Sequence, residues 1–101
     1  MKILWTDPAI DDLQAIRDYI ARDSELYADD FVLEIISATE RLESFPELGR
    51  VTPEADAKEI RELLFGNYRI IYRIHRDSIQ ILTVVNGSRD LSQNSFESWK
   101  N

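Results

Sequence analysis

Arginine is the residue type in this sequence best suited to do chemistry, because six arginines gather in its second half. They are Arg50, Arg61, Arg69, Arg73, Arg76 and Arg89. A guanidinium group donates N–H bonds from a rigid planar fork, which suits it to binding phosphates and carboxylates. We expect a target or a partner to be bound by Arg50, Arg61, Arg69, Arg73 and Arg89. The alternative for each is an ordinary salt bridge across neighbouring strands, such as one from Arg69 to Glu62 or Glu59.

Other residues with catalytic potential are few. His75 could act as a general acid or base near neutral pH, but its place at a predicted turn favours a solvated side chain. The pairs Asp11–Asp12 and Asp29–Asp30 point to different sides of a helix, so one metal ion could not easily use both members. The sequence contains no cysteine, no glycine-rich phosphate loop and no nucleophile motif. We expect no metal and no cofactor.

The charges are distributed unevenly along the chain. The net charge is −7, which argues against direct binding of DNA by this chain alone. Residues 7–45 hold eleven acids and three arginines, a balance of −8, whereas residues 46–101 hold eight acids and eight bases. The acidic excess therefore belongs to the first half, where it either keeps the protein soluble or offers a charged face to a partner.

The first half of the chain has the pattern of two helices. Thr6 or Asp7 can cap the first helix, with Pro8 in its first turn. Its apolar residues follow at helical spacing at Ala9, Leu13, Ile16 and Ile20. Ser24 or Asp23 can cap the second helix, which we expect to end at Pro46. Its apolar stripe is Phe31, Ile35, Ala38, Leu42 and Phe45. The short connection predicts an antiparallel helical hairpin.

The second half has the pattern of strands. Residues 2–5 form a short strand candidate, residues 46–57 read as a loop, and three strand segments follow at 58–65, 68–75 and 78–85. Short turns between these three predict an antiparallel meander. In the middle segment, one face carries Tyr68, Ile70, Tyr72 and Ile74, and the other carries Arg69, Ile71, Arg73 and His75. We expect the first face to pack on the helical hairpin and the second to be partly open and to carry arginine.

The fold class that we predict is α+β, as a single domain over residues 1–101. The N-terminus lacks a signal peptide, and no apolar run approaches the roughly 20 residues that span a bilayer, so we expect a cytoplasmic protein without membrane contact. The tail 90–101 is polar but contains Phe96 and Trp99. It could form a last helical turn on the domain or be disordered.

Several motifs in this order resemble one family. They are W-T-D-P-A at 5–9, D-L at 12–13, D-Y-I at 18–20, F-P-E-L-G-R at 45–50, R-E-L at 61–63, Y-R-I-I-Y-R-I at 68–74 and N-G-S-R at 86–89. Together they are similar to the ParE/RelE toxin superfamily, also called plasmid stabilisation proteins, over nearly the whole chain to about residue 91. The resemblance implies a type II toxin that inhibits growth and is silenced by a cognate antitoxin, whose C-terminal segment wraps the toxin.

The resemblance leaves two activities open. RelE-like members cut messenger RNA on the ribosome, and ParE-like members inhibit DNA gyrase. For the ribonuclease, the resemblance implies a phosphate clamp in which Arg69 and Arg89 match family arginines and Arg61 lies near a family lysine. A second family lysine falls near Glu59, the family tyrosine falls near Ser95 or Phe96, and Asn86 stands where many relatives have histidine.

These departures decide which activity we expect. Asn86 cannot exchange a proton near neutral pH, and the net charge of −7 opposes docking on ribosomal RNA. We therefore expect no catalytic residues and a ParE-like inhibitor of DNA gyrase. The alternatives are a ribosome-dependent endoribonuclease, with the ribosome and messenger RNA as partners, and a decayed, non-toxic interaction module.

Overall fold

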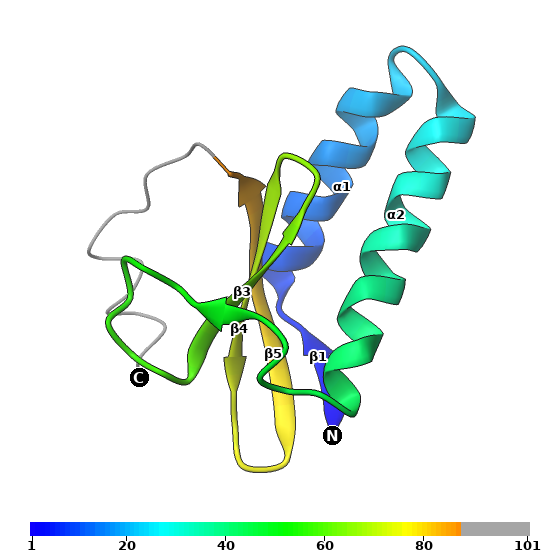
Figure 1. The fold of residues 1–101 in the computed structure, drawn as a ribbon. Coiled ribbons are helices and arrows are strands. Elements are labelled where there is room, and N and C mark those ends of the chain that lie inside the picture. The colour runs from blue at the N-terminus through cyan, green and yellow to red at the C-terminus, as the bar shows by residue number, and fades with distance from the viewer. Residues whose placement is uncertain (88–101) are drawn as a thin grey trace.

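The structure, a computed structural model, describes residues 1–87. It is an α+β fold in two layers, in which a helical hairpin covers one face of a five-stranded sheet (Figure 1). The hairpin consists of α1 (Asp7–Ala21) and α2 (Glu25–Glu40). The strands are β1 (Lys2–Trp5), β2 (Arg50–Val51), β3 (Ile60–Phe65), β4 (Tyr68–Ile74) and β5 (Ser78–Asn86), in the spatial order β1-β5-β4-β3-β2. The predicted fold class is confirmed.

Side-chain caps start both helices where the sequence predicted. The Thr6 hydroxyl accepts the N–H of Ala9 at 3.2 Å, and the Ser24 hydroxyl accepts the N–H of Tyr27 at 3.1 Å. Each hydroxyl satisfies one of the backbone donors that the first turn of a helix leaves unpaired. Of the alternatives in the sequence, the structure therefore selects Thr6 and Ser24 as the caps.

The end of the second helix differs from the prediction. α2 ends at Glu40 and continues as one turn of 3₁₀ helix, η1 (Arg41–Glu43), before Pro46. Because a 3₁₀ helix has a different number of residues per turn, the apolar stripe loses its register there. Leu42 is fully buried, as expected, whereas Phe45 is 65% exposed and does not belong to the core.

The sheet is mixed rather than wholly antiparallel. β3, β4 and β5 form the predicted meander, but β1 pairs with β5 in parallel, with Lys2 opposite Ser78 and Trp5 opposite Ile81. Thr6 extends the contact between β1 and β5, since its N–H and its hydroxyl both donate to the Ile81 carbonyl, at 3.1 and 2.8 Å. The sequence did not predict a partner for residues 2–5, and in the structure β1 fills the side of β5 that β4 leaves unpaired.

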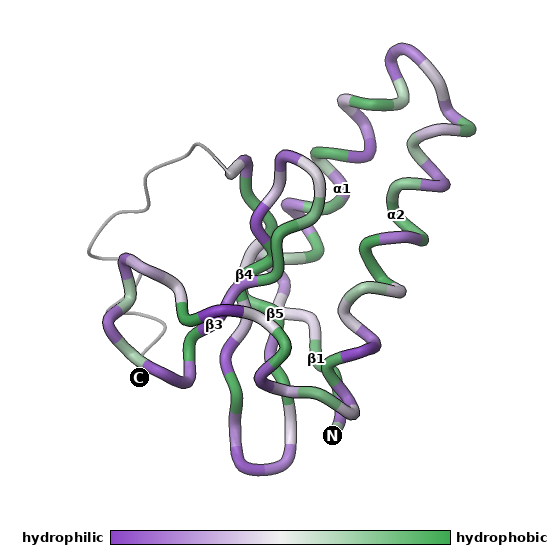
Figure 2. The backbone as a smooth tube through the Cα atoms, viewed as in Figure 1, coloured by the Kyte–Doolittle hydropathy of each residue, from purple (hydrophilic) through white to green (hydrophobic). Residues whose placement is uncertain are grey.

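The main core lies between the hairpin and the sheet. It is formed by buried residues of α1, α2, η1 and the strands, among them Leu13, Ile35, Leu42, Ile70 and Tyr72. The predicted alternation of β4 is confirmed, because Tyr68 and Ile74 also pack against this core. In Figure 2, hydrophobic and hydrophilic stretches alternate along both helices, while the turn between β4 and β5 is hydrophilic.

The second face of the sheet was expected to be partly open. Its middle is covered, whereas Leu64 and Arg50 on the same face remain exposed. Residues 52–57 fold over the middle and close a second cluster of buried side chains. This cluster contains Ala55, Ile60, Ile71, Leu82 and Val85. A β-bulge in β5 adds Leu82 to this cluster. The pairing passes from Ile71–Thr83 directly to Tyr72–Ile81, so Leu82 is an extra residue without a partner on β4. The predicted loop 46–57 thus contains the short strand β2 and a lid over the second face.

Candidate functional site

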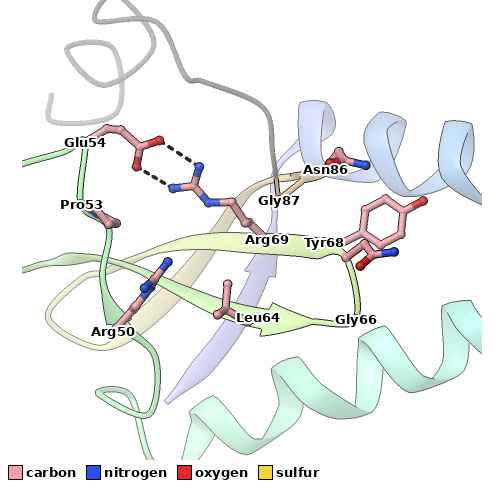
Figure 3. Close-up of a pocket in the computed structure, with 10 residues that line it drawn as sticks. Arg50, Pro53, Glu54, Leu64, Gly66, Tyr68, Arg69, Asn86 and Gly87 are labelled. Carbon is pink, nitrogen blue, oxygen red and sulfur yellow. Dashed lines mark hydrogen bonds and ion pairs between the residues drawn. The ribbon is translucent and has the colours of Figure 1, made fainter.

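Arg69 on β4 is the centre of a charged cluster on this second face. Its guanidinium donates from Nη1 and Nη2 to the two carboxylate oxygens of Glu54, at 2.9 and 2.7 Å, in an end-on pair drawn in Figure 3. Only 5% of Arg69 is exposed. Glu54 belongs to the segment 52–57, so the pair joins that segment to the sheet. A bidentate pair of this kind is among the stronger hydrogen-bonded contacts in proteins.

Glu62 on β3 extends the cluster. One of its carboxylate oxygens accepts from Arg69 at 3.1 and 2.6 Å, and the other accepts from Arg50 at 2.9 and 2.7 Å. The Glu62 side chain is 0% exposed, whereas that of Arg50 is 59% exposed. Two arginines and two glutamates therefore meet with no net charge, and the buried carboxylate has a cation on each side.

The pKa shifts follow from these contacts. The hydrogen bond from Arg69 lowers the pKa of Glu54 below its ordinary value of 4.5, although burial opposes the shift. The carboxylates of Glu54 and Glu62 raise the pKa of Arg69, with the Glu54 bond contributing most. Arg69 is therefore a permanent cation that both carboxylates hold in place.

A cavity of about 830 Å³ opens beside the cluster. Its lining comes from β2, the segment after it, the β3–β4 turn and the end of β5, and Figure 3 shows these residues. They include Arg50, Glu54, Tyr68, Arg69 and Asn86. The cavity brings together two of the predicted binding arginines, Arg50 and Arg69, with Asn86, the position for which the family resemblance implies a histidine.

The other predicted arginines lie elsewhere. Arg61 pairs across the sheet with Tyr72, and Arg69 pairs with Leu64, so Arg61 and Arg69 point to opposite faces. Arg61 donates to the carbonyl of Gly49 at 2.9 Å, at the edge of the sheet. Arg73 is half-buried towards the other end of β4, and Arg89 lies outside the described residues, as does the tail 90–101.

Glu54 is the residue of this cluster that sequence reasoning missed. Glu62 was one of two expected partners of Arg69, and the structure selects it over Glu59. Glu54 lies in a predicted loop, where no alternation exists to indicate which way a side chain points. The one available signal was the segment P-E-A-D-A at 53–57, in which two acids stand among small residues shortly before an arginine-rich sheet.

His75 takes no part in the charged cluster. Its Nε2 lies 3.0 Å from the amide oxygen of Gln80, at the end of β4 opposite Arg69. His75 follows the last residue of β4 and is half-buried, so the expected solvated side chain is only partly exposed and is held by this contact to β5.

A second concave region lies between the helices. It has a volume of about 420 Å³ and is lined by Ile10, Leu13, Gln14, Arg17, Asp29, Val32 and Leu33. Arg17 donates to Asp29 at 3.0 Å and so links α1 to α2 along this groove. Ile10 and Leu33 are half or more exposed there. Exposed apolar side chains in a groove are typical of a protein-binding surface.

Two negative observations apply to the part of the chain that the structure describes. Within residues 1–87, no group of three or more acidic, histidine or cysteine side chains could hold a metal ion. Among the same residues, no helix is long and apolar enough to cross a membrane.

The fold and its arginine-rich sheet define a small α+β domain of the RelE/ParE type, and comparison with known proteins agrees. The family model described as the ParE toxin of the type II toxin–antitoxin system, parDE, matches residues 3–91. The chain therefore belongs to this family of toxins, which implies a cognate antitoxin as its partner.

Individual relatives come from both branches of the superfamily. Toxin RelE2 of Caulobacter vibrioides is 33% identical over 89 residues, which cover 87% of this chain and 97% of the relative. A solved chain from the chromosomal ParDE TA system of P. aeruginosa superposes with a TM-score of 0.71 at 26% identity, covering 85% of this chain and 95% of that one. The two names leave the ParE-like and RelE-like activities undistinguished.

Proposed function

We propose that this chain is a ParE-like toxin that inhibits DNA gyrase by protein–protein contact, acts in the cytoplasm and is neutralised by its cognate antitoxin. The observation that carries this proposal is that two carboxylates already bind the guanidinium of Arg69. Its guanidinium, the best match to a phosphate-binding arginine of the family, is bound end-on by Glu54 and also by the buried Glu62.

A nuclease of this family type needs cations that converge on one phosphate, since electrostatic stabilisation of the developing charge is a large catalytic contribution. Here Arg61 and Arg69 point to opposite faces of the sheet. Asn86, at the edge of the same cavity, has no proton to exchange near neutral pH. A net charge of −7 further opposes association with ribosomal RNA. These features favour a non-enzymatic toxin.

The antitoxin has two kinds of surface available. The groove between α1 and α2 offers exposed apolar side chains to a helix of a partner. At the other end of the sheet, β2 covers only Arg61 and Glu62 of β3. The outer edge of β3 from Leu63 to Phe65 is therefore covered by no strand of the described residues, and an extended segment could pair there.

A ribosome-dependent endoribonuclease is the second candidate. It is favoured by the cavity that Arg50, Arg69 and Tyr68 share, and by the similarity to Toxin RelE2. In this case the Glu54 carboxylate occupies the place on the Arg69 fork that a phosphate would take, and substrate would have to displace it.

The two candidates are separated by adding the purified chain to a gyrase supercoiling assay and to an in vitro translation reaction in which the ends of the messenger RNA are mapped. We expect supercoiling to be blocked and the messages to stay intact. Cuts at the ribosomal A site that weaken in Arg50→Ala, but not in the control Arg41→Ala, would establish the ribonuclease instead. No effect in either assay would indicate a decayed interaction module.

A further inference from the structure

A cleft beside α2 combines aromatic rings with acidic side chains. It has a volume of about 530 Å³ and lies where α2 meets the β3–β4 turn. Its lining is Ile20, Tyr27, Asp30, Phe31, Glu34, Phe65, Gly66, Asn67 and Tyr68. In Figure 1 this turn, the yellow-green loop that joins β3 to β4, lies beside the helical hairpin.

The aromatic wall is held in place by Phe31. Its ring contacts Phe65 and Tyr68 edge-to-face, with centroid distances of 5.7 and 5.4 Å. Phe31 is buried, so these two partly buried rings rest on a fixed support. Tyr27 lies one helical turn before Phe31, on the same side of α2, and is 63% exposed. The cleft thus has a rigid base and an exposed tyrosine at its mouth.

The charge of the cleft is negative and is not balanced locally. Asp30 and Glu34 are separated by one turn of α2, and no lysine or arginine lines the cleft. Among residues 1–87, neither carboxylate takes part in an ion pair, in contrast to Glu54 and Glu62. The faces of aromatic rings also attract cations, so both features of the cleft favour the same ligand.

The cleft continues into its neighbours along α2. Glu34 and Phe65 also line the shallow hollow that contains Leu33, Ala38 and Arg41, and Leu33 in turn lines the groove between the helices. A single segment of a partner could therefore lie along α2 and reach the aromatic cleft. A second copy of this chain is a poor occupant, because each copy carries a net charge of −7.

We propose that the cleft of Tyr27, Asp30, Phe31, Glu34, Phe65 and Tyr68 binds an arginine side chain of the cognate antitoxin. A guanidinium stacks flat on an aromatic ring while its edge donates to carboxylates, which a lysine ammonium does less well. The inference rests on the proposed function in that it takes the partner to be the antitoxin.

The site can be tested without the antitoxin by titrating the ¹⁵N-labelled chain with N-acetyl-arginine methylamide. We expect saturable shifts of the Gly66 and Asn67 amide signals, with a Kd on the order of 1–10 mM for a single side chain. The uncharged isostere N-acetyl-citrulline methylamide should leave these signals unchanged. Equal shifts with both probes, or none with either, would overturn the proposal.

The partner is tested by calorimetry with the protein encoded beside this gene. We expect Asp30→Asn with Glu34→Gln, and separately Tyr27→Ala, to weaken the complex by roughly tenfold or more. The matched controls are Asp11→Asn with Glu40→Gln, which makes the same charge change outside the cleft, and Tyr19→Ala, an equally exposed tyrosine on α1. The controls should weaken the complex by less than about twofold.

The outcomes separate the two proposals. A tight complex that all variants retain would overturn the arginine site and leave the proposed function standing. A toxin dimer that only the cleft variants dissociate would identify a second copy as the occupant and overturn the proposal. No complex with the wild-type chain would contradict the proposed function, and the arginine titration would then decide whether the cleft binds a cation.

Discussion

Arg69 and Glu54, 15 residues apart in the chain, form a two-point ion pair that joins the segment over the second face of the sheet to β4. The pair lies against the fully buried carboxylate of Glu62, which also contacts Arg50. The alternation of β4 predicted Arg69 on a partly open face, but these contacts make it a structural residue. We therefore expect its replacement to lower the free energy of unfolding.

Replacing Arg69 with alanine should lower the free energy of unfolding by roughly 3–5 kcal/mol, because Glu62 is then left buried beside a single, largely exposed cation. Arg50→Ala is the matched control. It removes the exposed partner of the same carboxylate, and its effect should stay near or below about 1 kcal/mol. Urea unfolding followed by circular dichroism measures both. Equal losses for the two variants would contradict the structural role of Arg69.

The lowered pKa of Glu54 predicts a dependence of stability on pH. A carboxylate whose pKa is lowered by folding stabilises the native state fully above its ordinary value of 4.5, and this contribution is lost as the pH falls through the lower, folded value. The wild-type chain should therefore lose more stability below about pH 4.5 than Glu54→Gln does. Thermal melts between neutral pH and pH 3 test this. Glu47→Gln, whose side chain is largely exposed, should behave like the wild type.

Leu42 and Phe45 were expected on one apolar stripe, and the 3₁₀ turn separates them. Leu42→Ala should destabilise the fold by roughly 2–5 kcal/mol because it leaves a cavity under the hairpin. Phe45→Ala should change stability by no more than about 0.5 kcal/mol, since the ring is exposed. Unfolding midpoints of the two variants give the comparison, and a large loss for Phe45→Ala would place that ring in the core after all.

Gly49 occupies a position where a side chain would collide with the sheet. A Cβ atom there would lie 2.5 Å from the Glu62 carbonyl oxygen and 2.8 Å from the Tyr72 hydroxyl. The hydroxyl accepts the Gly49 N–H at 2.9 Å and donates to the Pro46 carbonyl at 2.7 Å. Gly49→Ala should therefore cost about 1–3 kcal/mol, as overpacking does in a buried site. Calorimetric melting measures the change, and an unaltered midpoint would show that β2 can move away from β3 without loss.

Local patterns determined much of this protein from its sequence. Apolar residues at helical spacing, with Thr6 and Ser24 as caps, predicted the helical hairpin, and period-two alternation predicted the meander and the face of β4 that packs on it. These features follow from interactions within a few residues of the chain, or from the requirement that one face of an element be buried. Two of the motifs that resemble the toxin family also reflect local structure. The motif at 45–50 follows the end of the helical hairpin, and the motif at 68–74 shows the alternating faces of β4.

Only the tertiary structure decided which separate segments meet. The parallel pairing of β1 with β5, the position of residues 52–57 over the second face, and the capture of Arg69 by Glu54 depend on the three-dimensional path of loops. The local sequence of a loop does not specify that path. The same holds for the cleft of Tyr27, Glu34 and Phe65, whose rings and carboxylates come from a helix and a strand that approach only when the main core packs. Alternation placed Arg61 and Arg69 correctly on β3 and β4, but only the pairing of Arg61 with Tyr72 and of Arg69 with Leu64 put them on opposite faces of one sheet.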